Sequence, residues 1–447
     1  MKKTISVFLA VIMISLLFAS CKKEPEPLPF TGKDYTIPTL DLSVLPENLK
    51  GTEYQYLYEL STVDDSKDYM AHPDSVLLKN GNILTMYPAG HGRGAVLNKI
   101  STDGGITWTE SIENVPVSWK DSKETPTVYR LNFTDGKTQD KLIMISANPK
   151  WVDEETTVGG FNCSISTDEG ESWTEFKRFY DLESENPVIP IVAMSSLTQL
   201  KENGEFVDKW MGLFHDAEFY NYKTILTFDE NGNAQWSVPE KYFAEYREIE
   251  QQSNMCEVEV IRSEHGKGDE LCLITRSNTK KMNSLVSFST DEGKTWSEPK
   301  ELPAALNGER HKAEYTQDGR LFITFRSIER GHKAEANALE TTMGGWISEG
   351  WIAWVGTYDD LKNGTEGQYR IKLAHIYTDD QTEPKYYAGA DTGYCGNVVL
   401  SDGTIMTSTY GKFSPEQNTS DGKTLKTYIC SKRINIKDTD ALVEKLK

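Results

Sequence analysis

The segment STDEGKTW at Ser289–Trp296 decides how the rest of the sequence is interpreted. Two close copies occur at residues 101–108 and 166–173, and both also end in tryptophan. In each copy the Asp and Ser/Thr side chains can hydrogen-bond the backbone of a tight turn, and glycine supplies a positive φ. The tryptophan then enters the core with the next strand. Each copy therefore predicts a hairpin turn that serves the fold and not the chemistry.

Weaker copies of this turn lie at residues 227–232, 358–360 and 420–424. The aspartates of the six turns stand at positions 103, 168, 229, 291, 359 and 421, separated by 65, 61, 62, 68 and 62 residues. A repeat of roughly 60 residues that contains several strands is typical of a β-propeller. The sequence thus predicts an all-β fold, a six-bladed β-propeller.

Apolar runs that flank turn residues predict the strand pairs of the blades. The pairs are 75–78 with 83–87, 127–131 with 141–146, 191–200 with 210–214, 257–261 with 270–275, 312–315 with 321–325, and 397–400 with 404–407. Residues 52–62 alternate as a strand does, and we expect them to close the ring by pairing with a last-blade strand at 425–430. An insertion at 330–352 is expected over the mouth of the ring, and 438–446 is the one segment with a helical pattern.

The first 20 residues have the features of a secretion signal, with Lys2 and Lys3 before an apolar run. Residues 17–21, LFASC, are similar to a bacterial lipobox, so we expect cleavage before Cys21 and its lipidation; a plain signal peptide is the alternative. Lys22 favours the outer membrane, on its periplasmic or its cell-surface side. We expect residues 21–50 to be a proline-rich tether and residues 51–447 to be the propeller.

Charge and cysteine content exclude several classes of protein. The net charge of −20 becomes −22 when Lys2 and Lys3 are removed, which argues against nucleic acid as a partner. The five remaining cysteines form no C-x-x-C pair, and we predict no metal and no cofactor. Cys256 and Cys272 either bridge neighbouring strands or remain buried thiols. We expect a monomer.

Polar and aromatic residues fall where inner strands start and second strands end, which is one mouth of the ring. The starts carry His72, Asp74, Glu124, Glu257, Arg310, His311 and Tyr394, and the ends carry His91, Arg93, His215, Arg276 and Arg326. Six of these residues keep a similar distance from the turn aspartate of their unit: 27 to 34 residues for His72, Glu257 and Tyr394, and 12 to 15 for His91, His215 and Arg276. That phasing predicts one shared pocket.

At this point the sequence resembles a known family. The acidic turns are similar to the Asp-boxes of sialidases. Residues 257–261, followed by 273–276 and an Asp-box, resemble the sialidase segment with the catalytic glutamate and an arginine. Gly393-Tyr394, followed by 398–403, resembles the segment with the nucleophilic tyrosine. The resemblance implies that Tyr394 is the nucleophile, Glu257 its base, and Arg276 and Arg370 a carboxylate clamp.

This pairing suits a keto-acid sugar. An anomeric carbon that bears a carboxylate repels a carboxylate nucleophile, so a neutral phenol beside a glutamate base is better. Arginine forks then hold the carboxylate of the sugar bidentately.

The sequence departs from the sialidase pattern at three places. Ala71-His72-Pro73 stands where the family has Arg-Ile-Pro, and Gly411 follows Tyr410 where the family has a glutamate. No Asp or Glu lies between residues 87 and 100, where the family has its acid/base aspartate. His91 or Asp74 would then donate the proton. Arg93, Arg310 and Arg326 would rebuild an anion pocket, with His72, His215 and His311 as further substrate-binding candidates.

These features predict an exo-acting glycoside hydrolase of sialidase-like type that removes a terminal, acidic sugar from a glycan. One alternative is a uronate lyase on a propeller scaffold, in which Arg neutralises the carboxylate and Tyr or His abstracts the α-proton. The other is a glycan-binding lipoprotein without turnover.

Overall fold

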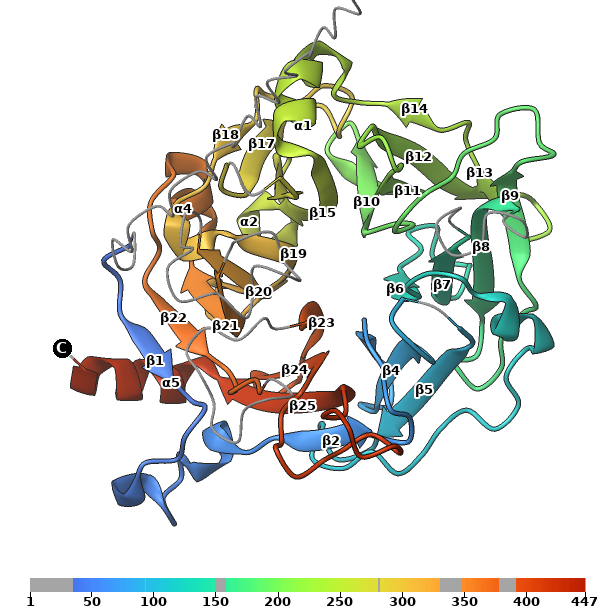
Figure 1. Cartoon of the computed structure of the whole chain (residues 1–447). Coiled ribbons are helices and arrows are strands. Elements are labelled where there is room, and N and C mark those ends of the chain that lie inside the picture. Colours follow the sequence, from blue (N-terminus) through green and yellow to red (C-terminus); the bar gives the residue numbers. More distant parts are fainter. Residues whose placement is uncertain are drawn as a thin grey trace, which may run out of the picture.

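The structure is a computed structural model that describes residues 35–92, 94–148, 158–279, 282–329, 347–377 and 391–446. Six β-sheets stand around a common centre and form a ring (Figure 1). The innermost strands of neighbouring blades contact one another around much of the ring. The predicted six-bladed, all-β propeller is confirmed.

Each blade is a small antiparallel sheet whose strands follow one another from the centre of the ring outward. Blades one to three are β3 (Asp74–Leu77), β4 (Ile83–Pro88) and β5 (Val96–Ser101); β6 (Thr127–Leu131), β7 (Lys141–Ala147), β8 (Gly159–Ser166) and β9 (Lys177–Asp181); and β10 (Ser196–Glu202), β11 (Glu205–His215), β12 (Asn221–Phe228), β13 (Ala234–Trp236) and β14 (Glu240–Lys241). Blades four to six are β15 (Met255–Arg262), β16 (Leu271–Ser277), β17 (Leu285–Ser289) and β18 (Lys300–Glu301); β19 (Gly308–Tyr315), β20 (Leu321–Glu329), β21 (Ile347–Gly356) and β22 (Tyr369–Lys372); and β23 (Gly393–Val399), β24 (Thr404–Gly411) and β25 (Tyr428–Asn435).

Helices are short and peripheral. They are η1 (Glu47–Leu49), η2 (Gln55–Tyr58), η3 (Val117–Asp121), η5 (Ala244–Tyr246), α1 (Arg247–Ser253), α2 (Ser263–Gly266), η6 (Ala304–Leu306), α4 (Tyr358–Asn363), α5 (Ile436–Val443) and η7 (Glu444–Leu446). The predicted C-terminal helix is α5 with η7, and the other helices were not predicted. Among the described residues, no helix is long and apolar enough to cross a bilayer.

The ring is closed by a strand from the start of the chain. β2 (Ser61–Asp64) pairs with β25, with Thr62 opposite Cys430, which confirms the predicted partner. The strand is shorter than the predicted 52–62, because residues 55–58 form η2 instead. That helical turn buries Leu57 and lets Tyr56 donate a hydrogen bond of 2.6 Å to Asp438.

The packed chain starts earlier than the predicted boundary at residue 51. β1 (Thr39–Asp41) pairs in parallel with β22 at the outer edge of blade five (Figure 1), and Leu40 and Leu42 are buried. The tether cannot therefore extend to residue 50. The signal segment, Cys21 and the start of the tether lie outside the described residues, as do residues 330–346 of the insertion; its remainder, 347–352, belongs to β21.

The acidic turns have the predicted geometry in their strongest copies. Asp103 accepts hydrogen bonds from the Ser101 hydroxyl at 2.8 Å and from the Thr107 backbone N–H at 2.8 Å. Gly105 has φ 88°, and a Cβ there would lie 2.5 Å from Cγ of Met406 in the next blade. The turn thus also seals the contact between blades.

The turn predicted at residues 358–360 is instead a helix start. Thr357 accepts a hydrogen bond from the Asp360 N–H, and the Asp360 carboxylate accepts one from the Thr357 N–H, which is a capping box for α4. The same residue types that close a hairpin begin a helix at this position.

In blades one to five, the strands place the turns and the predicted site at opposite ends. In blade four, Cys256 pairs with Arg276 at one end of the β15–β16 ladder, and Arg262 pairs with Leu271 at the other. Leu271 in turn pairs with Ser289, which leads into the Asp-box. The turns of blades one to five therefore lie on the face opposite the site. The turn at 420–424 instead follows the site end of β24, where Tyr410 pairs with Gly393. All five cysteines of the described chain are free and buried, so Cys256 and Cys272 do not form a bridge.

Candidate active site

Several of the predicted site residues have a strained, left-handed backbone at the site end of the inner strands. Five residues at the site end of their blades have a left-handed backbone: His72 (φ 52°), Met194 (50°), Glu257 (49°), Arg310 (54°) and Tyr394 (56°). In blades four, five and six the ladder register shifts at this residue, as in a β-bulge. Non-glycine residues in this conformation are costly and cluster at functional sites. Four of the five are the residues the phasing had assigned to the mouth of the ring.

Tyr394 and Glu257 meet across the ring mouth. The Tyr394 hydroxyl donates a hydrogen bond of 2.5 Å to Oε1 of Glu257, although 137 residues separate them in the chain. Nη1 of Arg276 lies 2.9 Å from both oxygens of the same carboxylate. Both Tyr394 and Glu257 are buried, so the phenol, the carboxylate and the guanidinium interact in a region of low dielectric.

The protonation of this pair follows from its surroundings. Burial would raise the pKa of Glu257, but the Arg276 charge and the hydrogen bond from the Tyr394 hydroxyl hold it below its usual range. Burial and the Glu257 charge hold the pKa of Tyr394 well above its usual value. The resting state is therefore a neutral phenol that donates to a carboxylate, which is the arrangement in which a base activates a nucleophile.

A second buried carboxylate, Glu309, links two arginines. Arg276 Nη2 lies 3.1 Å from Glu309 Oε1, and Arg326 Nη2 bonds Glu309 Oε2. Glu309 pairs with Arg326 across β19 and β20 just as Cys256 pairs with Arg276 across β15 and β16. Arg326 is thus the blade-five counterpart of Arg276. Arg310 completes the set, with its guanidinium carbon 5.8 Å from the Tyr394 ring centroid.

His72 lies against the Tyr394 ring, with 4.0 Å between centroids. The Thr125 hydroxyl donates its proton to Glu124 at 2.5 Å, so it accepts from the Nδ1–H of His72 at 3.0 Å. Burial, followed by the charges of His91 and the nearby arginines, holds the pKa of His72 well below its usual value. A neutral imidazole therefore stands where the sialidase pattern has an arginine.

His91 lies on the blade-one side of the site and is half exposed. Its Nδ1 is 2.7 Å from the Tyr69 hydroxyl and 3.3 Å from Oδ2 of Asp391. The loop that carries it passes close to blade two, because a Cβ at Gly92 would lie 2.6 Å from Glu124 Oε1. Only glycine fits at this approach. Arg93 lies outside the described residues.

Three predicted residues have other roles. Asp74 is buried on β3, where its carboxylate accepts the Val128 N–H at 3.0 Å and so holds blade one to blade two. His311 is fully buried, stacks on Phe325 and bonds the Leu306 carbonyl at 2.9 Å.

Arg370 is the third of these residues and corrects the predicted clamp. It lies on β22, fully buried beneath the Tyr35 ring at 4.4 Å, and it donates to Ser327 at 2.7 Å. A guanidinium held in this way anchors the N-terminal segment. Arg326, and not Arg370, has the place beside Tyr394 and Glu257.

Burial lowers the pKa of His215 to about 4, although the nearby Glu257 charge acts in the opposite direction. Its ring stacks on Phe219. It is thus a neutral group behind Glu257.

Glu309, Asp391, Tyr69 and Tyr410 were missed as site residues. Asp391 is joined by hydrogen bonds to both tyrosines, one of them the 2.8 Å bond from the Tyr410 hydroxyl. Glu309 carried one usable signal, because it directly precedes Arg310 at an inner-strand start. Within the described chain, no three His, Cys, Asp or Glu side chains are placed to hold a metal ion.

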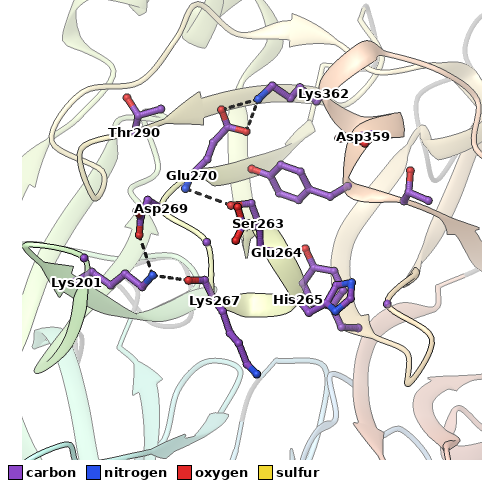
Figure 2. A pocket seen from close by; sticks show the side chains of 16 residues that line it. Lys201, Ser263, Glu264, His265, Lys267, Asp269, Glu270, Thr290, Asp359 and Lys362 are labelled. Carbon is purple, nitrogen blue, oxygen red and sulfur yellow. Dashed lines mark hydrogen bonds and ion pairs between the residues drawn. The ribbon is translucent and has the colours of Figure 1, made fainter.

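A separate polar pocket of about 740 Å³ opens on the Asp-box face between blades three, four and five (Figure 2). Lys201 pairs with Asp269 at 2.8 Å, and Lys362 pairs with Glu270 at 3.0 Å. These two ion pairs tie the β15–β16 connection to both neighbouring blades. The charges along this pocket therefore hold blades together.

The protein has a sialidase-like fold, a six-bladed propeller, and a buried tyrosine–glutamate pair lies at the mouth of the ring. The BNR repeat-like domain family matches residues 118–381, which is more than half of the 447 residues. The chain belongs to this family, and the predicted resemblance is confirmed.

Solved structures with the same fold include glycosidases. A protein of unknown function from Dyadobacter fermentans has a TM-score of 0.52 and 14% identity, covering 84% of this chain and 97% of that one. An α-L-arabinofuranosidase from Fusarium graminearum has a TM-score of 0.51 and 11% identity, covering 91% and 99%. The NanB sialidase from Streptococcus pneumoniae has a TM-score of 0.50 and 11% identity, covering 84% and 70%. Such identities show the fold alone. No curated protein matches the sequence.

Proposed function

We propose that the protein is an exo-acting glycoside hydrolase that removes a terminal acidic sugar from glycans. The observation that carries the proposal is the 2.5 Å hydrogen bond from the Tyr394 hydroxyl to Glu257. Two residues from different blades, both on strained backbone, form a ready nucleophile and base.

The reaction would proceed in two displacements. Glu257 takes the phenolic proton as Tyr394 Oη bonds to the anomeric carbon, while the glycosidic C–O bond breaks and the leaving oxygen is protonated by a separate donor. Water then attacks the anomeric carbon and gives a proton to that donor's conjugate base. The Tyr394–sugar bond breaks, and Glu257 returns the proton to the phenolate. The enzyme is thereby restored.

An acidic sugar is supported by the nucleophile and by its surroundings. A phenol suits an anomeric carbon that bears a carboxylate, since a carboxylate nucleophile would be repelled. Arg276, Arg326 and Arg310 lie around the Tyr394–Glu257 pair, and burial in low dielectric strengthens their interaction with an anion. The neutral His72 in place of an arginine makes the clamp different from that of sialidases. We therefore include ulosonic acids other than N-acetylneuraminic acid, and uronic acids, among the substrates.

The test is a panel of 4-methylumbelliferyl glycosides of sialic, other ulosonic and uronic acids, with neutral sugars for comparison. We expect release of the fluorophore from at least one acidic glycoside. Tyr394→Phe should lower kcat/KM by at least about 10³-fold. Tyr242→Phe, another buried tyrosine, is the matched control and should retain activity.

Three results would contradict the proposal. Full activity of Tyr394→Phe would remove the nucleophile. An unsaturated product that absorbs in the ultraviolet would indicate a lyase. Binding of glycans without turnover of any panel member or of mixed natural glycans would indicate a binding protein.

A further inference from the structure

A chain of polar contacts runs behind His91 and joins blade one to blade six. The Tyr69 hydroxyl contacts His91 Nδ1 at 2.7 Å and donates its proton to Oδ2 of Asp391. The other carboxylate oxygen of Asp391 accepts the 2.8 Å hydrogen bond from Tyr410. Asp391 directly precedes the strand that carries Tyr394, and Tyr410 lies on the neighbouring strand β24. The two blades that close the ring therefore meet at this contact.

The direction of these hydrogen bonds fixes where the protons of His91 sit. A phenol has a single proton, and Tyr69 gives its proton to Asp391, so its oxygen can only accept from His91. Nδ1 of His91 therefore carries a hydrogen. In the imidazolium form, Nε2 carries the second proton, and this proton is the one that His91 can give to a ligand. The carboxylate at 3.3 Å from Nδ1 favours that charged form.

Both aromatic rings and charged side chains surround His91. The His72 ring lies 4.9 Å away and the Tyr410 ring 6.5 Å away, measured between centroids. Arg326 reaches the far oxygen of Asp391 at 3.7 Å, and its positive charge opposes a second cation. Burial raises the pKa of Asp391, and the Tyr410 hydrogen bond and the Lys412 charge oppose this rise. The Asp391 carboxylate thus places a negative charge in direct contact with His91, and its effect is partly offset by Arg326.

The position of His91 suits a donor that must meet a leaving group. Its side chain is 50% exposed, whereas Tyr394, Glu257 and His72 are buried. The His72 ring contacts both His91 and the nucleophile, with centroid distances of 4.0 Å to Tyr394 and 4.9 Å to His91. The nucleophile and His91 therefore flank the same buried imidazole.

We propose that Asp391, acting both directly and through Tyr69, is the positioning residue that holds His91 as the proton donor to the leaving oxygen. This inference rests on the proposed function. As the glycosidic C–O bond breaks, the Nε2 proton of His91 passes to that oxygen, and the attacking water returns a proton to Nε2 in the second displacement. Asp391 remains a carboxylate throughout, and Tyr69 keeps its proton.

The experiment follows the titration of His91 by NMR in the whole protein with ¹⁵N-labelled histidine, and it needs no substrate. The chain has seven histidines, and a His91→Gln variant assigns the signal by its loss. Asp391→Asn removes the charge that favours the imidazolium, so the midpoint of His91 should fall by about one pH unit. Tyr69→Phe breaks the relay and should move the midpoint in the same direction. Asp291→Asn, in the blade-four turn on the opposite face, should leave it unchanged.

A midpoint that is the same in wild type, Asp391→Asn and Tyr69→Phe would overturn the inference, provided that circular dichroism shows all three folded. Kinetics give the second readout on whichever glycoside is hydrolysed. The alkaline limb of the kcat/KM profile should move to lower pH in Asp391→Asn by the same amount as the NMR midpoint. An unmoved limb would also overturn the inference. Failure of the proposed function is seen separately, as absence of hydrolysis across the substrate panel.

Discussion

A single buried carboxylate, Glu309, holds two arginines of the site in place. It is 1% exposed and bonds Arg276 on one side and Arg326 on the other. Breaking a buried ion pair leaves an uncompensated charge and is costly, so the three side chains form a rigid unit. Arg326 also approaches Asp391 at 3.7 Å, which connects this unit to the contacts behind His91.

Arg326 and Arg370 can be compared directly, because the sequence resemblance places Arg370 in the carboxylate clamp whereas the structure places Arg326 beside Tyr394 and Glu257. Arg326→Lys keeps the charge but loses the planar fork, and we expect kcat/KM on the best glycoside to fall by roughly 100-fold. Arg370→Lys should leave kcat/KM within about twofold, because Arg370 is buried under Tyr35; its free energy of unfolding should fall by about 1–3 kcal/mol. Kinetics and thermal melts of both variants measure this. Equal losses of kcat/KM in the two folded variants would return Arg370 to the clamp.

The sequence predicted the residues of the tyrosine–glutamate pair better than the residues that hold His91 in place. Glu257, Tyr394 and Arg276 were found because they resemble a family pattern and share a phase with the repeat. Asp391 and Tyr69 meet only because the ring closes, and 322 residues separate them. Neither a repeat nor a local pattern encodes that contact. Arg370 was misplaced because its distance from Tyr394 in sequence matched the family, while β22 carries it away from the inner strands.

At the level of elements, hairpins depend on local sequence and edge pairings do not. The β3–β4 hairpin follows its Asn-Gly turn, and β6, β7 and their counterparts lie within a few residues of the predicted ranges. β1 and β2 have little local signal, because each is only three or four residues long and pairs with a strand more than 300 residues away. A local signal can also be ambiguous. The short polar motif at Thr357–Asp360 suits both a turn and a helix start, and in the structure it begins α4.

The Asp-box turns make a prediction at this scale. Asp168 accepts hydrogen bonds from the Ser166 hydroxyl at 2.8 Å and the Ser172 N–H at 2.9 Å. Asp168→Ala should lower the free energy of unfolding by about 1 kcal/mol, measured by urea denaturation. Glu171→Ala in the same turn is the control and should change it by less than about 0.5 kcal/mol. Neither variant should alter kcat/KM, since the turn lies on the face opposite the site.

The free energy of unfolding that Asp168→Ala loses should depend on pH in one direction. Burial would raise the pKa of Asp168, but hydrogen bonds from Ser172 and Ser166 hold it below its usual value. A group whose pKa is lowered by folding contributes stability above its unfolded pKa, about 3.9 for Asp, and loses it as the pH falls through the folded pKa. The difference between Asp168→Ala and wild type should therefore be full at neutral pH and shrink below about pH 4. A constant difference down to pH 2 would show that the carboxylate charge is not involved.

For the whole molecule, the N-terminal segment acts as a strap across the blade-five and blade-six side of the ring. Besides the β1–β22 pairing, Arg370 N–H donates to the Pro38 carbonyl at 2.9 Å. The buried Lys432 of β25 donates to the Leu42 carbonyl at 2.8 Å and to the Leu373 carbonyl. Residues 35–42 thus cover the seam between two blades. Each blade of a propeller keeps a short outer edge, so a strap that covers one edge and the neighbouring seam stabilises the fold.

Two truncated proteins test this role and the boundary of the folded unit together. A protein that begins at residue 35 keeps the strap and should melt at the same temperature as the full chain. One that begins at residue 51 loses the buried Tyr35, Leu40 and Leu42, and it loses the hydrogen bonds from Arg370 to Tyr35 and to the Pro38 carbonyl. Burial of each apolar side chain is worth roughly 1.5–3 kcal/mol, offset by the entropy of ordering the segment, so we expect a net loss of roughly 3 kcal/mol. Differential scanning calorimetry of the two proteins measures the difference, and β2 is present in both, so ring closure is held constant. If both melt together, residues 35–50 contribute nothing to the fold and the propeller begins at residue 51 after all.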